Sequence, residues 1–479
     1  MNECQSKKVF EYFEKICSIP HGSGNVKQIS DFLVSFAEEK NLEYKRDESL
    51  NVVIYKNGTK GYENAEPVIL QGHMDMVAVK EAGITKDLAA EGIEIQMDGD
   101  FISGKGTSLG GDDGIAVAYM LAILDSDSIK HPPLEAVFTV DEEIGMLGAT
   151  AFDCSVLKGK KMLNIDSEDE GIFTVSCAGG AIARCVLPFK MEPVVATVIE
   201  FRVEGFTGGH SGVEINKGRA NANIVMGRIL LNLFQKIGMR LMILNGGEKD
   251  NAIADMCECA IAVNSEQKDN ALKIINETFE EIKDEYKETD PDIRVITNAM
   301  EEGFADTFSS NATLAAVVML NNFPNGVQKR EPEMELQIRT SLNLGVIRTN
   351  QDTLDFVFLV RSSKDSEKNY LIEKLKSITE IFGGNVEVSG VYPGWTYKKE
   401  SQLRDVLVEE YYKLYGENPV VEGIHAGLEC GIFASAIEGL DVVSIGPQMY
   451  DIHTTNEKLS ISSTERTWKL ILNTLERLK

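Results

Sequence analysis

The sequence lacks an apolar run long enough to cross a membrane. The longest that we find, residues 115–124, is half of the roughly 20 residues that a membrane-spanning helix needs. The N-terminus leads directly into an amphipathic pattern, without the apolar core or small-residue cleavage site of a secretory signal. We therefore expect a cytoplasmic protein.

Cysteines and basic residues are also scarce. The 8 cysteines among 479 residues are scattered without a CxxC pair, which argues against a disulfide-stapled scaffold and favours reduced, structural thiols. The 75 acidic residues outnumber the 48 basic ones, for a net charge of −27, and an excess of acid repels phosphate backbones and anionic lipids. Because no local basic patch offsets it, we expect neither a nucleic-acid nor a membrane partner.

The length predicts two or three domains, although no Pro- or Ser-rich linker separates them. Apolar runs alternate with helical patterns at both ends of the chain, which favours an α/β domain with a mostly parallel sheet. Residues 181–390 have longer amphipathic helices and alternating strand patterns such as Met334–Leu342. We interpret this segment as an inserted α+β domain, so that residues 1–180 and 391–479 together form the first domain.

Acidic residues and histidines follow several of the predicted strands. Ligands of open α/β sheets bind beyond the carboxyl ends of the strands, and such residues are metal-ligand types. They are His73 and Asp75 after Val68–Leu70, Glu142 and Glu143 after Ala136–Val140, Asp166 after Met162–Ile165, Asp112 in a Gly-rich turn, and His453 after Val442–Ile445. Only six histidines occur in the chain, and two of them fall in this set.

Counting charge favours two metal ions over one. Three carboxylates (Asp112, Glu143, Asp166) and two neutral histidines (His73, His453) around two divalent cations leave one positive charge, which a bound hydroxide neutralises. Asp112 is the candidate bridging ligand. Such nitrogen and oxygen ligands accept zinc, manganese or cobalt, whereas a calcium site is disfavoured because calcium seldom recruits histidine.

Two acids near these ligands have further candidate roles. Glu142 can act as the general base for the attacking water, and Asp75 can orient the imidazole of His73. The alternative interpretation is that the adjacent acids form a solvated turn.

Six segments, in the same order along most of the chain, resemble the bacterial aminoacyl-histidine dipeptidases, also called cytosolic non-specific dipeptidases, within the di-zinc peptidase and aminoacylase group. They are Gly72-His-Met-Asp-Met76, Leu109-Gly-Gly-Asp-Asp-Gly114, Val140-Asp-Glu-Glu-Ile-Gly-Met146, Asn164-Ile-Asp-Ser-Glu168, Gly208-Gly-His-Ser-Gly212 and Ile424-His-Ala-Gly-Leu-Glu-Cys-Gly431. The resemblance implies a di-zinc catalytic domain with an inserted lid domain that often dimerises. It also implies the metal-ligand, orienting and general-base roles given above.

The same resemblance implies substrate-binding roles for three residues of the inserted domain. His210 matches a histidine that stabilises the oxyanion, and Arg361 matches the position that holds the substrate carboxylate. Asn251 matches a family asparagine, although Ala254 here replaces the usual proline. Another departure is Gly111, where the family often has alanine.

We therefore expect a metal-dependent dipeptidase that hydrolyses unblocked dipeptides, Xaa-His among them, by attack of a hydroxide bridging two zinc ions. We expect a homodimer through the lid domain. An aminoacylase or tripeptidase on the same scaffold, or a non-catalytic metal-binding protein, remains an alternative.

Overall fold

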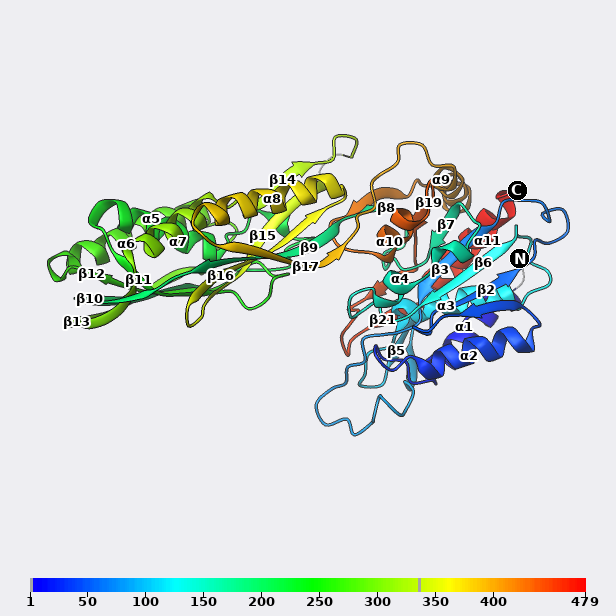
Figure 1. Cartoon of the computed structure of the whole chain (residues 1–479). Coiled ribbons are helices and arrows are strands. Elements are labelled where there is room, and N and C mark those ends of the chain that lie inside the picture. Colours follow the sequence, from blue (N-terminus) through cyan, green and yellow to red (C-terminus); the bar gives the residue numbers. More distant parts are fainter. Residues whose placement is uncertain (1–2, 335–336) are drawn as a thin grey trace. The chain divides into compact units, whose positions relative to one another are not determined.

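The computed structural model describes residues 3–334 and 337–479 and divides into two compact units (Figure 1). Unit 1 comprises Met1–Ser176, Trp395–Gly423 and Leu428–Lys479. Unit 2 comprises Cys177–Gly394 together with the four-residue segment Ile424–Gly427. Unit 1 is thus assembled from segments at both ends of the chain.

An eight-stranded sheet forms the centre of unit 1. Its strands lie in the order β1 (Glu43–Arg46), β2 (Val52–Lys56), β6 (Leu134–Thr139), β3 (Val68–His73), β7 (Lys161–Asn164), β19 (Asp441–Ser444), β8 (Ile172–Cys177) and β18 (Val420–Ile424). The neighbouring pairs among β6, β3, β7 and β19 are parallel, whereas the pairs β1–β2, β2–β6 and β19–β8 are antiparallel. The predicted α/β class is confirmed, with a parallel centre and antiparallel flanks.

Helices cover both faces of this sheet, as the alternation of side chains along β3 demonstrates. A Cβ on Gly72 would lie 2.6 Å from the Cβ of Ala116 in α3, so α3 packs closely on that face. The preceding residue, Gln71, points to the opposite face and contacts Glu429 at the start of α10. The helices of unit 1 are α1 (Glu3–Cys17), α2 (Lys27–Glu39), α3 (Gly111–Leu124), α4 (Leu147–Ala151), α9 (Gln402–Tyr415), α10 (Glu429–Ala436) and α11 (Ile461–Arg477).

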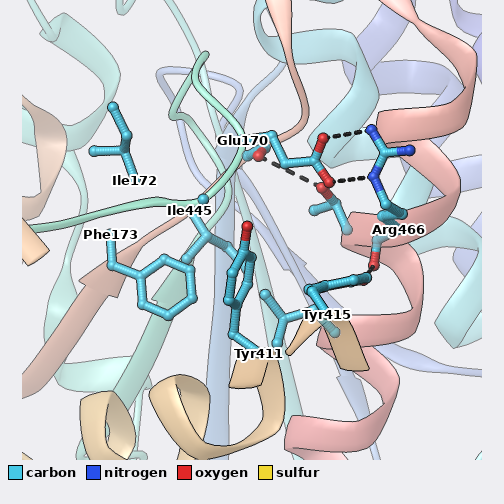
Figure 2. A pocket seen from close by; sticks show the side chains of 11 residues that line it. Glu170, Ile172, Phe173, Tyr411, Tyr415, Ile445 and Arg466 are labelled. Carbon is cyan, nitrogen blue, oxygen red and sulfur yellow. Dashed lines mark hydrogen bonds and ion pairs between the residues drawn. The ribbon is translucent and has the colours of Figure 1, made fainter. Parts of the chain in front are cut away.

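An ion pair in unit 1 connects the loop between β7 and β8 to the last helix, α11. Figure 2 shows the Glu170 carboxylate beside the Arg466 guanidinium at the edge of a small pocket lined by Tyr411 and Tyr415. Both N–O distances are 2.6 Å, the bidentate geometry that makes such pairs strong and directional. A separate antiparallel sheet in unit 1 consists of β20 (Met449–Tyr450), β21 (Lys458–Ser460), β5 (Phe101–Gly104) and β4 (Ile95–Asp98).

Unit 2 is a two-layer α+β structure with its helices on one face of a nine-stranded antiparallel sheet (Figure 1). Side chains such as Phe201, Ile229 and Phe279 form the core between the layers. The strands are β13 (Arg294–Phe308), β10 (Met191–Glu204), β12 (Cys257–Val263), β11 (Arg240–Gly246), β15 (Ile338–Thr349), β16 (Thr353–Ser362), β9 (Gly179–Pro188), β17 (Asn385–Tyr392) and β14 (Gly326–Arg330). The helices are α5 (Ala222–Ile237), α6 (Lys268–Glu285), α7 (Ser310–Asn322) and α8 (Asp365–Ile381).

The strand predicted over Met334–Leu342 begins later in the structure. Met334 lies in a turn, residues 335 and 336 lie outside the described residues, and β15 starts at Ile338. Seven of the eight cysteines have a described side chain, and none of these seven forms a disulfide bond. None of the described helices has the length and apolar character that crossing a lipid bilayer requires.

Candidate metal centre

Two groups of potential metal ligands lie beyond the carboxyl ends of β3, β6 and β7. One group consists of His73, Asp112 and Asp166, and the other of Asp112, Glu143 and His453. Within each group the ligand atoms lie within 4.8 Å of one another. The structure therefore brings together all five residues that were predicted from the sequence to be metal ligands.

Asp112 lies between the two groups and is shared by both. Its Oδ1 is 3.1 Å from His73 Nε2, and its Oδ2 is 3.0 Å from His453 Nε2. Asp166 Oδ1 lies 3.4 Å from His73 Nε2, and Glu143 Oε1 lies 2.9 Å from His453 Nε2. Each oxygen of one carboxylate thus serves a different ligand group, which is the arrangement of a bridging ligand.

Asp75 contacts both the first histidine and the turn that carries the two glutamates. Its Oδ1 lies 3.4 Å from His73 Nδ1 and accepts a hydrogen bond from the backbone N–H of Glu142 at 3.1 Å. Its Oδ2 accepts from Ser23 Oγ at 2.8 Å and from the N–H of Glu143 at 3.4 Å. Because Asp75 occupies the Nδ1 side of His73, Nε2 is left to coordinate a metal, as in the carboxylate–histidine pairs of known metal sites.

The electrostatics of the cluster also fit a bound cation. Burial raises the pKa of Glu142 to about 9 and that of Asp166 to about 6. The Asp112 carboxylate, and then that of Glu143, raises the pKa of His453 to about 10. The raised pKa values favour the protonated forms of Glu142, Asp166 and His453 where no cation is bound. A divalent cation would instead favour ionised carboxylates and neutral histidines. Glu142 contributes no atom to either ligand group, which leaves its carboxyl group free for proton transfer.

A buried polar network beneath the ligands was missed by sequence reasoning. Glu429 accepts hydrogen bonds from Gln71 Nε2 and Thr139 Oγ1, both at 2.6 Å. Gln71 Oε1 in turn accepts from Asn164 Nδ2 at 2.6 Å. Gln71 and Asn164 each precede a ligand by two residues, His73 and Asp166 respectively, so the period of a strand places them on the same side as the ligands. That spacing was the available signal.

In unit 2, His210 and Arg361 together form a pair of hydrogen-bond donors. His210 Nδ1 accepts from the N–H groups of Gly212 and Val213, both at 3.2 Å, and these two contacts favour the tautomer with the proton on Nε2. Arg361 Nη2 lies 3.5 Å from this Nε2, and the Arg361 side chain is buried with its Nη1 donating to Tyr392 Oη at 3.1 Å. Burial and the Arg361 charge lower the pKa of His210. Two donors directed at the same space create a site for an anionic or carbonyl oxygen.

Asn251 reaches this segment through its backbone. Its carbonyl accepts a hydrogen bond from the N–H of Ser211 at 2.9 Å, next to His210. Its side chain is exposed. Ala254, at the position where proline was expected, is buried and its carbonyl accepts from the N–H of Ala222 at 2.9 Å. The structure thus brings His210 and Arg361 together and places Asn251 beside them.

Known proteins resemble this chain in sequence and in fold. The chain is 34% identical over its whole length to the cytosol non-specific dipeptidase of Escherichia coli, 99% of which is covered. The crystal structure of aminoacylhistidine dipeptidase from Vibrio alginolyticus matches with a TM-score of 0.92 and 35% identity, covering 98% of this chain and 96% of that one. Aminopeptidase PepT from Bacillus cereus shares the fold at 15% identity, with a TM-score of 0.57 over 99% of this chain and 98% of that one.

The family model for peptidase family M20/M25/M40 matches residues 69–477, which include every residue of the two ligand groups. Together with the 34% identity to the E. coli dipeptidase along the full chain, this match shows that the chain belongs to peptidase family M20/M25/M40.

Proposed function

We propose that this chain is a metal-dependent dipeptidase that hydrolyses unblocked dipeptides, including those with a C-terminal histidine. The observation that carries the proposal is the Asp112 carboxylate, whose two oxygens face His73 and His453 in two separate ligand groups. The E. coli and Vibrio relatives, which are named as dipeptidases, support the same reaction and substrate class.

His73, Asp112 and Asp166 would hold one divalent ion, and Asp112, Glu143 and His453 a second. The ligand set suits zinc and also accepts manganese or cobalt. When bound, the two ions polarise the scissile carbonyl and lower the pKa of the attacking water.

Glu142 supplies the proton transfer in this proposal. Its carboxylate takes a proton from the attacking water and then gives that proton to the leaving amine. Asp75 fixes the backbone of Glu142 and orients His73. Proton transfer by Glu142 thus relies on a backbone position that Asp75 already fixes in the fold.

The donors of unit 2 recognise the substrate. The Nε2–H of His210 stabilises the oxygen that becomes negatively charged at the scissile carbonyl. The Arg361 guanidinium binds the free carboxylate of the dipeptide, and its fork geometry suits bidentate binding. Asn251, beside His210, contributes a further polar contact to the substrate.

We further propose that unit 1 is the catalytic domain and that unit 2 is a lid through which two chains associate. Supporting evidence is the sheet face of unit 2 opposite its helices, where Ile243 and Ile296 are each 44% exposed. Ile296 lies opposite Arg202, and Ile243 opposite Ala260, on this face. Light scattering of the wild type and of Ile296→Glu tests the association: a dimer that the substitution weakens supports it, and a wild-type monomer contradicts it.

We place the enzyme in the cytoplasm, in keeping with the name of the E. coli relative.

The proposed activity is tested with three substrate types and controlled metal content. Protein stripped of metal is supplied with zinc, manganese or cobalt and assayed on a dipeptide, the matching tripeptide and an N-acetyl amino acid. Metal-dependent hydrolysis of the dipeptide in preference to the other two supports the proposal. Preference for the tripeptide or the N-acetyl substrate would instead assign a tripeptidase or an aminoacylase, and no hydrolysis with any metal would contradict a peptidase.

A further inference from the structure

A buried glutamate, Glu457, binds the turn that carries Asp112. Its Oε2 accepts hydrogen bonds from the N–H groups of Leu109 at 2.7 Å and Gly110 at 3.1 Å. Its Oε1 accepts from the N–H of Gly111 at 2.7 Å. Glu457 is 2% exposed, and the residue that follows this turn is the shared ligand Asp112.

The turn is shaped to receive a carboxylate. Gly110 has φ 72° and ψ 34°, in the left-handed region, and Gly111 is the first residue of α3. Consecutive N–H groups at such a turn and at a helix N-terminus point outward and attract an anion. A Cβ on Gly110 would lie 2.7 Å from Met76 Sδ, and one on Gly111 would lie 3.3 Å from Glu457 Oε1. Gly111 therefore permits the close approach of the chain to this carboxylate, whereas Gly110 supplies the left-handed backbone of the turn and leaves room for Met76.

Glu457 is also tied to the second histidine ligand, because it follows His453 by only four residues. Its side chain thus connects the loop of His453 to the turn of Asp112, two segments about 340 residues apart in sequence. In the described part of the chain, no lysine, arginine or histidine pairs with Glu457; its partners are the three N–H groups. A buried carboxylate beside an anionic cluster, without a cation, is costly to maintain. Its position suggests a role in holding the ligands.

We propose that Glu457 is a positioning residue that joins the Asp112 turn to the His453 loop, so that both ligands of one metal position are held as a unit. The inference rests on the proposed metal-dependent function. Because Asp112 belongs to both ligand groups, displacement of its turn weakens binding at both positions. Glu457 itself supplies no atom to either ligand group.

Glu135 offers a matched control for this role. It is 3% exposed, and its carboxylate accepts backbone N–H bonds from Lys158 and Gly159 at 2.9 to 3.0 Å. It lies at the start of β6, at the opposite end of that strand from Glu142 and Glu143. Replacing either glutamate by glutamine therefore removes the same kind of interaction, but only one of the two lies at the metal ligands.

The test compares Glu457→Gln and Glu135→Gln as full-length proteins. Metal-free protein is titrated with Zn²⁺ against a chromophoric chelator, and the visible absorption of the Co²⁺-loaded protein is recorded. We expect E457Q to bind Zn²⁺ about 10- to 100-fold more weakly, the effect typical of groups that orient metal ligands, and to change the Co²⁺ spectrum. We expect E135Q to lower the melting temperature without either change.

The other outcomes contradict either the role of Glu457 or the proposed metal-dependent function, and the two cases can be told apart. Wild-type affinity and spectrum in E457Q, or equal losses in E457Q and E135Q, would overturn the role of Glu457. A wild-type protein that binds no metal would instead overturn the proposed function. If E457Q does not fold, Glu457→Asp keeps the charge one methylene short of the turn and is expected to weaken Zn²⁺ binding, whereas unchanged binding would refute the inference.

Discussion

The carboxylate of Asp75 accepts the backbone N–H of Glu142 at 3.1 Å while it lies 3.4 Å from the Nδ1 of His73. One buried acid thus fixes both a proposed metal ligand and the proposed general base. An apolar side chain at this position would leave the N–H groups of Glu142 and Glu143 without their acceptor. The backbone carbonyl of residue 75, 3.0 Å from His73 Nδ1, would still support the imidazole.

Replacing Asp75 by asparagine is expected to weaken zinc binding and to lower kcat, each by about 10- to 100-fold. The amide retains one oxygen acceptor but turns a donor toward groups that themselves donate. The measurements are the zinc affinity of the metal-free protein and the steady-state kinetics of the loaded one. Ser23→Ala, which removes one of the hydrogen bonds to Asp75, serves as the control and should cost much less. Equal kinetics for D75N and wild type would contradict this role.

Glu142→Gln is expected to reduce kcat by about 10²- to 10⁴-fold, the range for a general acid–base group. Zinc content should remain that of the wild type, because Glu142 supplies no ligand atom. Elemental analysis and turnover of one preparation check both statements. Loss of metal together with activity would make Glu142 a ligand, and retained activity would remove it from proton transfer.

Arg361→Lys tests whether this arginine binds the carboxylate of the substrate. Lysine keeps the charge but loses the bidentate fork. Losing a charged hydrogen bond costs about 2 kcal/mol, so we expect KM to rise about 30-fold for a dipeptide. A dipeptide amide, which lacks the carboxylate, should be affected far less. Arg184→Lys, at a half-buried arginine paired with Asp355 and Glu387, should keep the kinetics of the wild type. An equal loss on both substrates would contradict the assignment.

His425 makes the stability of the protein depend on pH. It is buried with its Nε2 2.7 Å from Ser341 Oγ, and burial, with the nearby Arg361 charge, lowers its pKa to about 3. An unfolded histidine titrates near pH 6.5. Between these values the unfolded chain binds a proton that the native chain does not, so native stability falls as the pH drops through this window.

Proton uptake by unfolded His425 lowers the free energy of unfolding by at most about 1.4 kcal/mol for each pH unit of acidification. Above pH 6.5 this dependence on pH is absent. His425→Gln cannot bind that proton and should show a shallower loss of stability between pH 6.5 and 4. The measurement is the free energy of urea unfolding of both proteins across this range. Parallel pH profiles would refute a depressed pKa for His425.

Residues near strand ends could be predicted from the sequence because their signals are local. His73 and Asp166 follow apolar runs directly, and the rule for ligand sites in α/β sheets then brings them together. Resemblance to a known family was needed for His210 and Arg361, since neither a lone histidine in a glycine-rich turn nor one arginine in a strand indicates anion binding.

The contacts of Glu457 and the return of Ile424–Gly427 to unit 2 had no local signal. Glu457 binds backbone N–H groups, which every residue possesses, so no side-chain pattern marks the partner. The Asp75 contacts to the glutamate turn are hidden for the same reason. Packing of distant segments, rather than residue type, creates these interactions.

Metal stoichiometry tests the central claim, a pair of metal positions sharing Asp112, most directly. The metal content of wild type, Asp166→Asn and Asp112→Ala is determined by elemental analysis of protein purified without chelator. The account predicts about two divalent ions per wild-type chain, a loss confined to one position in D166N, and loss of both in D112A. A single ion in the wild type, or a D112A protein that still binds one ion at full affinity, would contradict it.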